Sequence, residues 1–307
     1  MSISDQIRQA VLLLAHGSPD SVEQIPEFLS NVTGGRPLPL AVVEEVKHRY
    51  AQVGCFPLTY LTVKQGELLS NRLHMPVYVG MRNWHPLVAQ TLARMNADGV
   101  RHAGVICMAP QNSRTSVGLY RSSLRGADGK MKFDFVESWH DQPRLIEAFA
   151  ERLRTGLAGA ENEYGKVPPV IFTAHSVPER TILEGDPYED QAKHTADLVA
   201  AAVGLDRSAW KFAFQSQGMS GGTWLGPTVE QTILQLKAAG NDGVFIQSVG
   251  FLCDNIEILY DIDIGFRGFA EAQGMRLWRA ESLNTSPLLT EALAEIVHSR
   301  TSVAVAN

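Results

Sequence analysis

The chain is poor in cysteine. Its 307 residues contain three, Cys55, Cys107 and Cys253, and these lie far apart. An odd, scattered set excludes a disulfide framework and a four-cysteine zinc or iron–sulfur site. Cys107 and Cys253 adjoin apolar runs and are predicted to be buried small hydrophobic residues. We therefore expect a cytoplasmic protein.

Positive charge is also scarce. The formal net charge is −6 and the pI is about 5.9, so no basic field attracts nucleic acid. No apolar run approaches the ~20 residues that span a bilayer. Residues 1–5 lack the basic and apolar regions of a signal peptide. We expect no nucleic-acid partner and at most peripheral contact with a membrane.

Two nucleotide-binding motifs are missing. The sequence has no G-x-x-x-x-G-K-[ST] and no G-x-G-x-x-G after its first apolar run. These motifs cradle phosphates. Their absence argues against nucleotide-dependent enzymes.

Short apolar runs alternate with longer amphipathic stretches. The runs predict strands at 10–15, 76–80, 103–109, 133–137, 169–174, 211–215, 243–249 and 275–279. Helical patterns cover 87–96, 143–157, 192–203, 227–239 and about 287–300. Nearly continuous apolar strands are typical of parallel sheets covered on both faces. The alternation therefore predicts an α/β fold with open, doubly wound sheets.

Two pairs of matching segments indicate an internal duplication. Residues 11–19 and 170–178 each end an apolar run with Ala-His and then reach a proline. Residues 84–92 resemble residues 224–233, in the same order along the chain. We predict two similar Rossmann-like domains, residues 1–160 and 161–307, with the final helix packed on either of them.

The first candidate for chemistry is His175. At the end of a buried strand its imidazole can reach open space, accept a proton near neutral pH and bind a metal. The alternative is a histidine that only hydrogen-bonds the loop that it begins. Position alone does not separate these readings.

The second candidate is an acidic row that follows the strand at 243–249. Asp254, Glu257 and Asp261 are spaced i, i+3 and i+7, which predicts three carboxylates on one helical face. Acidic residues early in a helix also simply favour its dipole. Three like charges in a row cost energy unless a cation, a proton or water relieves them. The row therefore predicts a conduit for cations or protons.

Several segments together resemble the ferrochelatases, which insert ferrous iron into a porphyrin in haem biosynthesis. The matching segments are Phe-Thr-Ala-His-Ser-Val-Pro-Glu at 172–179, Gly-Asp-Pro-Tyr at 185–188, Phe-Gln-Ser to Trp-Leu-Gly-Pro over 214–227, and Val-Gly-Phe to Glu-Ile-Leu-Tyr-Asp over 249–261. The resemblance runs over nearly the whole chain. It implies a chelatase-like fold of two domains with parallel sheets and an active site in the cleft between them.

The resemblance also implies roles for residues. His175 and Glu257 are the expected catalytic pair, facing each other across the porphyrin and binding the metal. Asp261 continues the acidic path as a further metal ligand, and the next acidic position of the family is Gly265 here. His16 stands where related enzymes carry a tyrosine near the metal, so we expect it to contact both metal and porphyrin. A histidine can accept the pyrrole protons, and a carboxylate can hold the dehydrating cation.

The overall pattern is most similar to the compact bacterial enzymes that use coproporphyrin III, which we expect here rather than protoporphyrin IX. Arg49 and Tyr120 are the implied propionate contacts. Gln111, which replaces a frequent histidine, and Ser113 are further expected porphyrin contacts. We expect a monomer with porphyrin and Fe²⁺ as partners, no cofactor beyond that iron and no iron–sulfur cluster.

Two alternatives stay open at the level of sequence. His16-Gly17-Ser18 resembles the small cobalt and sirohydrochlorin chelatases, in which that histidine binds metal. A protein that binds tetrapyrroles without catalysis is the other alternative. The presence of both His175 and Glu257 favours the enzyme.

Overall fold

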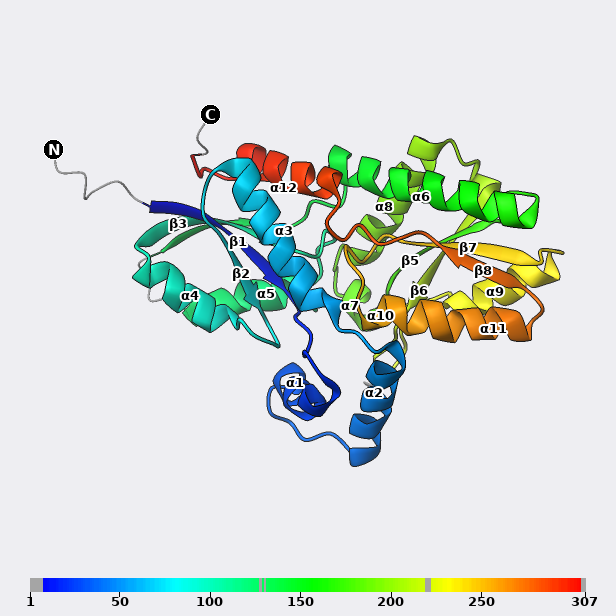
Figure 1. The fold of residues 1–307 in the computed structure, drawn as a ribbon, viewed down its shortest axis with the longest axis horizontal. Coiled ribbons are helices and arrows are strands. Elements are labelled where there is room, and N and C mark those ends of the chain that lie inside the picture. Colours follow the sequence, from blue (N-terminus) through cyan, green and yellow to red (C-terminus); the bar gives the residue numbers. More distant parts are fainter. Residues whose placement is uncertain (1–7, 127–128, 130, 219–221, 305–307) are drawn as a thin grey trace. The chain divides into compact units, whose positions relative to one another are not determined.

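The computed structural model describes residues 8–126, 129, 131–218 and 222–304. Residues 1–5, expected to lack a signal peptide, lie outside that part. The chain divides into two compact units. The first consists of Met1–Pro110, Ser116–Trp139 and Asn284–Asn307, and the second of Gln111–Thr115 and His140–Leu283. Each unit contains a four-stranded sheet with helices around it (Figure 1).

The sheet of the first unit has the order β2-β1-β3-β4 with all strands parallel. Its strands are β1 (Arg8–Ala15), β2 (Val77–Met81), β3 (Val100–Cys107) and β4 (Lys132–Val136). Its helices are α1 (Ile25–Thr33), α2 (Leu40–Val53), α3 (Pro57–Leu73), α4 (Val88–Ala97), α5 (Val117–Ser123) and α12 (Pro287–Arg300), with short 3₁₀ turns η2 (Val22–Gln24) and η3 (Leu124–Gly126). The apolar run of β1 lies in the centre and is fully buried, as strands covered on both faces require.

The sheet of the second unit has the order β6-β5-β7-β8, again parallel. Its strands are β5 (Val170–His175), β6 (Trp210–Gln215), β7 (Gly243–Ser248) and β8 (Arg276–Arg279). Around it lie α6 (Pro143–Tyr164), α7 (Glu179–Leu183), α8 (Tyr188–Val203), the 3₁₀ turn η4 (Arg207–Ala209), α9 (Val229–Ala238), α10 (Ile256–Leu259), the π-helix η5 (Asp261–Phe266) and α11 (Arg267–Ala272).

All eight predicted strands are confirmed, and so is the parallel α/β fold. The predicted burial of Cys107 and Cys253 is confirmed as well. Helix bounds differ more, because α8 begins at Tyr188 and α6 continues to Tyr164. Among the described residues, no helix combines the length and the apolar character needed to cross a membrane.

The two sheets share one topology, as the repeated motifs predict. β1 occupies in the first sheet the place that β5 occupies in the second. The turns after the edge strands also match in detail. The amide of Met81 donates to the carbonyl of Pro86 at 2.7 Å, and the amide of Phe214 donates to that of Pro227 at 2.8 Å. His16 and His175 therefore lie at the ends of equivalent strands.

The division between the units differs from the predicted boundary at residue 160. α6 belongs to the second unit, where a Cβ on Gly156 would lie 2.5 Å from the ring of Phe245. α12 belongs to the first unit, and its Glu291 accepts a hydrogen bond from Arg72 on α3 at 2.7 Å. The linker-like composition near residue 160 marks the end of a helix rather than a change of unit.

Candidate functional site

His175 is the last residue of β5, a strand whose preceding residues are all buried. The hydroxyl of Tyr188 donates to its backbone carbonyl at 2.9 Å. Its ring Nδ1 donates to the carbonyl of Ser176. These contacts fix the ring and leave Nε2 as the nitrogen available for proton transfer.

Glu257 is presented by the loop that follows β7. Gly250 lets this loop approach β5 closely, because a Cβ there would lie 2.9 Å from the Cα of Ala174. Asn255 then caps α10, with its Oδ1 accepting from the amides of Glu257 at 2.9 Å and Ile258 at 3.1 Å. This cap fixes where the helix begins and therefore where the carboxylate points.

His175 and Glu257 meet directly. Nε2 of the histidine lies 3.0 Å from Oε1 of the glutamate, and the two side chains are 35% and 31% exposed. At this distance the two groups are in direct hydrogen-bond contact, and their expected placement across a porphyrin stays a prediction. The two groups form one acid–base unit.

The environment favours the charged form of the imidazole. Burial alone would lower the pKa of His175, but the charge of Glu257 and its hydrogen bond oppose this. The Ser176 carbonyl and the charge of Asp261 act in the same direction, and the net pKa is raised. The pair can thus hold a proton on the imidazole.

Asp261 begins the π-helix η5 and is held by Ser216. The Ser216 hydroxyl donates to Oδ2 of Asp261 at 2.5 Å. Ser216 has a φ of 59°, which residues other than glycine seldom adopt, and strained backbone of this kind clusters at functional sites. Within the wider helix the amide of Gly265 donates to the carbonyl of Tyr260 at 2.9 Å. Such π segments are also frequent at functional sites.

Asp254 does not share a helical face with Glu257 and Asp261, which corrects the predicted row. The helix begins only at Ile256, and it widens into the π-helix from Asp261 onward. Residues outside the helix, or beyond a change in its pitch, do not follow the assumed spacing of 3.6 residues per turn. Asp254 instead accepts a hydrogen bond from Ser282 at 2.8 Å.

No preformed metal cage is present in the parts of the chain that the structure describes. There, no group of three or more His, Cys, Asp or Glu side chains is arranged to hold a metal ion. The ligand set expected from the resemblance, His175, Glu257, Asp261 and His16, stays a prediction.

Gln111 and Ser113 are buried and bind within the second unit. Gln111 is 2% exposed, and its amide donates to the carbonyl of Val249 at 3.0 Å. Ser113 is 1% exposed and donates to Asp186 at 3.1 Å. A structural role accounts for both side chains, so we leave them out of the porphyrin contacts proposed below.

His16 lies in the first unit, directly after β1. Its Nδ1 donates to the carbonyl of Gly17 at 3.0 Å, so a metal ligand would have to be Nε2. The ring packs edge-on against Phe28, with the centroids 5.8 Å apart. The side chain is half-buried, and its role as a ligand stays a prediction.

The two expected propionate contacts also lie in the first unit. Arg49 on α2 forms an ion pair with Glu45 at 2.8 Å, and its side chain is 44% exposed. Tyr120 on α5 is buried, with the guanidinium of Arg82 5.8 Å from the centre of its ring. Neither contact with a porphyrin is tested by this geometry.

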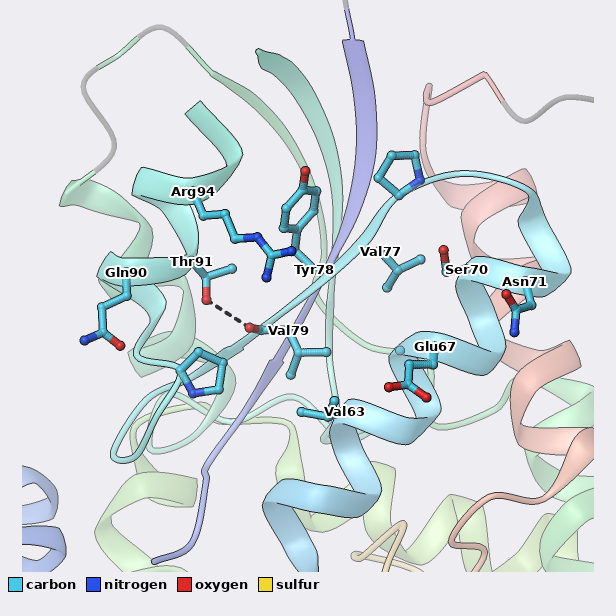
Figure 2. A pocket seen from close by; sticks show the side chains of 13 residues that line it. Val63, Glu67, Ser70, Asn71, Val77, Tyr78, Val79, Gln90, Thr91 and Arg94 are labelled. Carbon is cyan, nitrogen blue, oxygen red and sulfur yellow. Dashed lines mark hydrogen bonds between the residues drawn. The ribbon is translucent and has the colours of Figure 1, made fainter. Parts of the chain in front are cut away.

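A hollow of about 640 Å³ runs along β2, the edge strand of the first sheet, between α3 and α4 (Figure 2). The hydroxyl of Thr91 donates to the carbonyl of Val79 at its floor, at 2.9 Å. Glu67 and Arg94 stand on its helical walls (Figure 2). None of the candidate catalytic residues lines it, so the hydrogen-bonded pair, and not this hollow, identifies the site.

Sequence reasoning did not assign roles to Tyr188 and Ser216. Both belong to segments that match the family, but nothing in a linear pattern says which atom a tyrosine or serine hydroxyl reaches. A polar residue directly after a strand is the one signal that singles out Ser216. The structure adds both as supports for His175 and Asp261.

Comparison with known proteins identifies the family of the chain. The ferrochelatase family model matches residues 8–301. A ferrochelatase of Acidobacterium capsulatum is 54% identical over 308 residues, covering 95% of this chain and 94% of the relative. A coproporphyrin III ferrochelatase of Geobacillus kaustophilus is 32% identical over 302 residues, covering 94% and 95%.

The solved structure of SirB from Bacillus subtilis with Fe³⁺ has a TM-score of 0.58 at 12% identity and covers 96% of both chains. At that identity the likeness shows the chelatase-like fold alone. The family match and the identity to the relatives establish more than the fold. The chain belongs to the ferrochelatase family, the lyases of haem biosynthesis that insert iron into a porphyrin.

Proposed function

We propose that this ferrochelatase inserts Fe²⁺ with His175 as the proton acceptor and Glu257 as the residue that holds the cation. The observation that carries the proposal is the 3.0 Å contact between Nε2 of His175 and Oε1 of Glu257. A base and a cation ligand within one hydrogen bond of each other can couple proton removal to metal entry.

The coupling follows from charge. With Glu257 ionised and no cation bound, its charge raises the pKa of His175 and favours the imidazolium. When Fe²⁺ binds Glu257, the positive charge opposes that effect and drives the proton from Nε2 to water. The neutral Nε2 then takes the proton of one pyrrole N–H and releases it to water, and it does the same with the second pyrrole N–H. The electron pairs left on the two nitrogens bind the iron.

Asp261 and His16 complete the proposed metal path. The hydrogen bond from Ser216 favours the ionised form of Asp261 and fixes its orientation, so a hydrated cation meets an oriented carboxylate near Glu257. We assign His16 as a ligand of iron in the product. Substitution of His16 by Phe tests this role, because loss of a nitrogen ligand changes the absorption spectrum of the bound product. An unchanged spectrum would contradict it.

Coproporphyrin III is the proposed porphyrin. It carries more propionate carboxylates than protoporphyrin IX and therefore gains more from contacts with Arg49 and Tyr120. The bond of Arg49 to Glu45 lies on the exposed surface of one helix, and such pairs are worth about 0.3–0.5 kcal/mol. A substrate carboxylate can replace Glu45 at little cost.

An anaerobic assay of the purified protein with Fe²⁺ tests both parts of the proposal. We expect kcat/KM to be at least about tenfold higher with coproporphyrin III, the effect of roughly 1.4 kcal/mol of extra binding. Arg49→Gln should reduce that preference, whereas Lys47→Gln on the same helix should preserve it. Equal kcat/KM values for the two porphyrins would overturn the substrate assignment. Absence of iron insertion with either porphyrin would overturn the function.

A further inference from the structure

The side chain of Arg279, at the end of β8, joins two carboxylates. Its Nε lies 2.7 Å from Oδ1 of Asp263, and its Nη2 lies 2.8 Å from Oδ2 of the same residue. Two parallel bonds of this kind make a directional, bidentate pair. Nη2 also lies 3.6 Å from Oδ1 of Asp254. Only 17% of the Arg279 side chain is exposed, so solvent screens these pairs less than it screens a surface ion pair.

These two carboxylates bracket the proposed catalytic ones in the sequence. Asp254 precedes Glu257 by three residues, and Asp263 follows Asp261 by two. Arg279 therefore binds one carboxylate near each end of the segment that carries Glu257 and Asp261.

The segment needs tertiary contacts to hold its conformation. α10 has only four residues, and the π-helix η5 follows it directly. Helices this short are not stable by themselves, and π geometry is rare. Ile258, Ile262 and Phe266 bury the apolar side of the segment in the core of the second unit. Apolar contacts set its depth but are not directional, whereas a guanidinium fork also fixes its rotation.

The four carboxylates of this region differ in their partners. Asp254 and Asp263 are paired with Arg279. Glu257 and Asp261 instead contact His175 and Ser216. Arg279 thus pairs with the acidic residues on either side of the two proposed metal ligands.

We propose that Arg279 is a positioning residue for iron insertion, which acts through Asp254 and Asp263 on the orientation of Glu257 and Asp261. The proposal rests on the roles assigned above to His175 and Glu257. In this proposal the ion pairs of Arg279 with Asp254 and Asp263 contribute to catalysis by orienting the metal ligands, although Arg279 itself contacts no substrate.

The test compares Arg279→Gln and Arg279→Lys with Arg276→Gln, a change of an exposed arginine on the same strand. For Arg279→Gln we expect kcat/KM for Fe²⁺ to fall about 10- to 100-fold, as small misplacements of reacting groups do. The KM for the porphyrin should stay within about twofold, because the fork acts on the metal side of the site. Lysine keeps the charge but lacks the fork, so Arg279→Lys should recover only a minor part of the loss. Arg276→Gln should match the wild type.

Asp263→Asn provides a second, milder variant in case Arg279→Gln does not fold. It should lower kcat/KM for Fe²⁺ in the same selective way. The double variant should lose little more activity than either single variant, because both changes break the same ion pair. Wild-type kcat and KM for iron in a folded Arg279→Gln or Asp263→Asn variant would overturn the proposal. So would a loss that lowers activity equally for both substrates in proportion to the folded fraction. A wild-type protein that inserts no iron would instead contradict the proposed function itself.

Discussion

Nε2 of His175 and Oε1 of Glu257 lie 3.0 Å apart, which joins the end of β5 to the first turn of α10. Both side chains belong to the second unit, and each is oriented by backbone contacts of its own. A base and a carboxylate held in this way can exchange a proton without rearranging the fold.

Loss of either member of the pair should nearly abolish iron insertion. We expect His175→Ala and Glu257→Gln each to lower kcat by about 100-fold or more, the range for removal of a positioned acid–base group. Porphyrin binding, followed by fluorescence quenching, should remain measurable. Matched controls are His194→Ala on α8 and Glu271→Gln on α11, both exposed. Turnover close to that of the wild type in either catalytic variant would refute the assignment.

The protonation of His175 should depend on Glu257. Burial lowers the pKa of His175, but the charge and hydrogen bond of Glu257, the Ser176 carbonyl and the charge of Asp261 together raise it by more. Glu257→Gln should therefore lower the pKa of His175, measured by NMR titration of the imidazole protons. Identical titration curves in the two proteins would contradict the proposed coupling.

The contact between His175 and Glu257 should also make the free energy of unfolding depend on pH in a defined direction. A raised folded pKa means that the contribution is fully present below the unfolded histidine value, about 6.5, and is lost as the pH rises through the folded pKa. The wild type should therefore exceed Glu257→Gln in free energy of unfolding more at pH 6 than at pH 9. Urea unfolding at a series of pH values measures this difference, and a gap that widened with pH would have the wrong sign.

Two substitutions of Ser216 separate its hydroxyl from its backbone conformation. Ser216→Ala and Ser216→Gly both remove the donor to Asp261, so both should raise the KM for Fe²⁺. Only glycine relieves the positive φ of 59°, and the glycine variant should be about 1 kcal/mol more stable than the alanine variant. Kinetics and thermal unfolding of the pair check both parts. An unaltered KM for iron would show that the hydroxyl does not serve Asp261.

Asp134 should stabilise the first unit only above acidic pH. Burial raises the pKa of Asp134, but hydrogen bonds from Ser302 and the nearby His102 lower it to a net value well below the usual range. A carboxylate whose pKa is lowered by folding stabilises the folded state at pH values above its unfolded pKa. This stabilisation is lost as the pH falls toward the folded pKa. Asp134→Asn should cost about 1–3 kcal/mol at pH 7, as loss of a charged hydrogen bond does.

The cost of Asp134→Asn should shrink below about pH 4, near the unfolded pKa of an aspartate. Asp197→Asn, at an exposed position on α8, serves as the control and should leave stability unchanged at both pH values. Hydrogen exchange of β4 reports on the first unit separately from the second. A cost that does not vary with pH would show that the charge of Asp134 is not its source.

The sequence by itself determined the architecture and the central residue. Nearly continuous apolar runs are typical of strands in parallel sheets covered on both faces, and all eight strands could be predicted from the short apolar runs. The repeated Ala-His ending placed His16 and His175 at the ends of equivalent strands, and the two sheets have the same order. Motifs around His175 and Glu257 were enough to indicate the family, because they keep unusual residue types at fixed spacing.

The tertiary structure alone decided which side chains act together. Linear spacing grouped Asp254 with Glu257 and Asp261, but a late helix start and a π-helix separated it from them. The partners that decide each role, Ser216 for Asp261 and Arg279 for Asp254, come from other strands and loops. Periodicity describes one element at a time, whereas hydrogen bonds and ion pairs depend on distances between elements. Those distances are set only when the sheet brings the ends of its strands together.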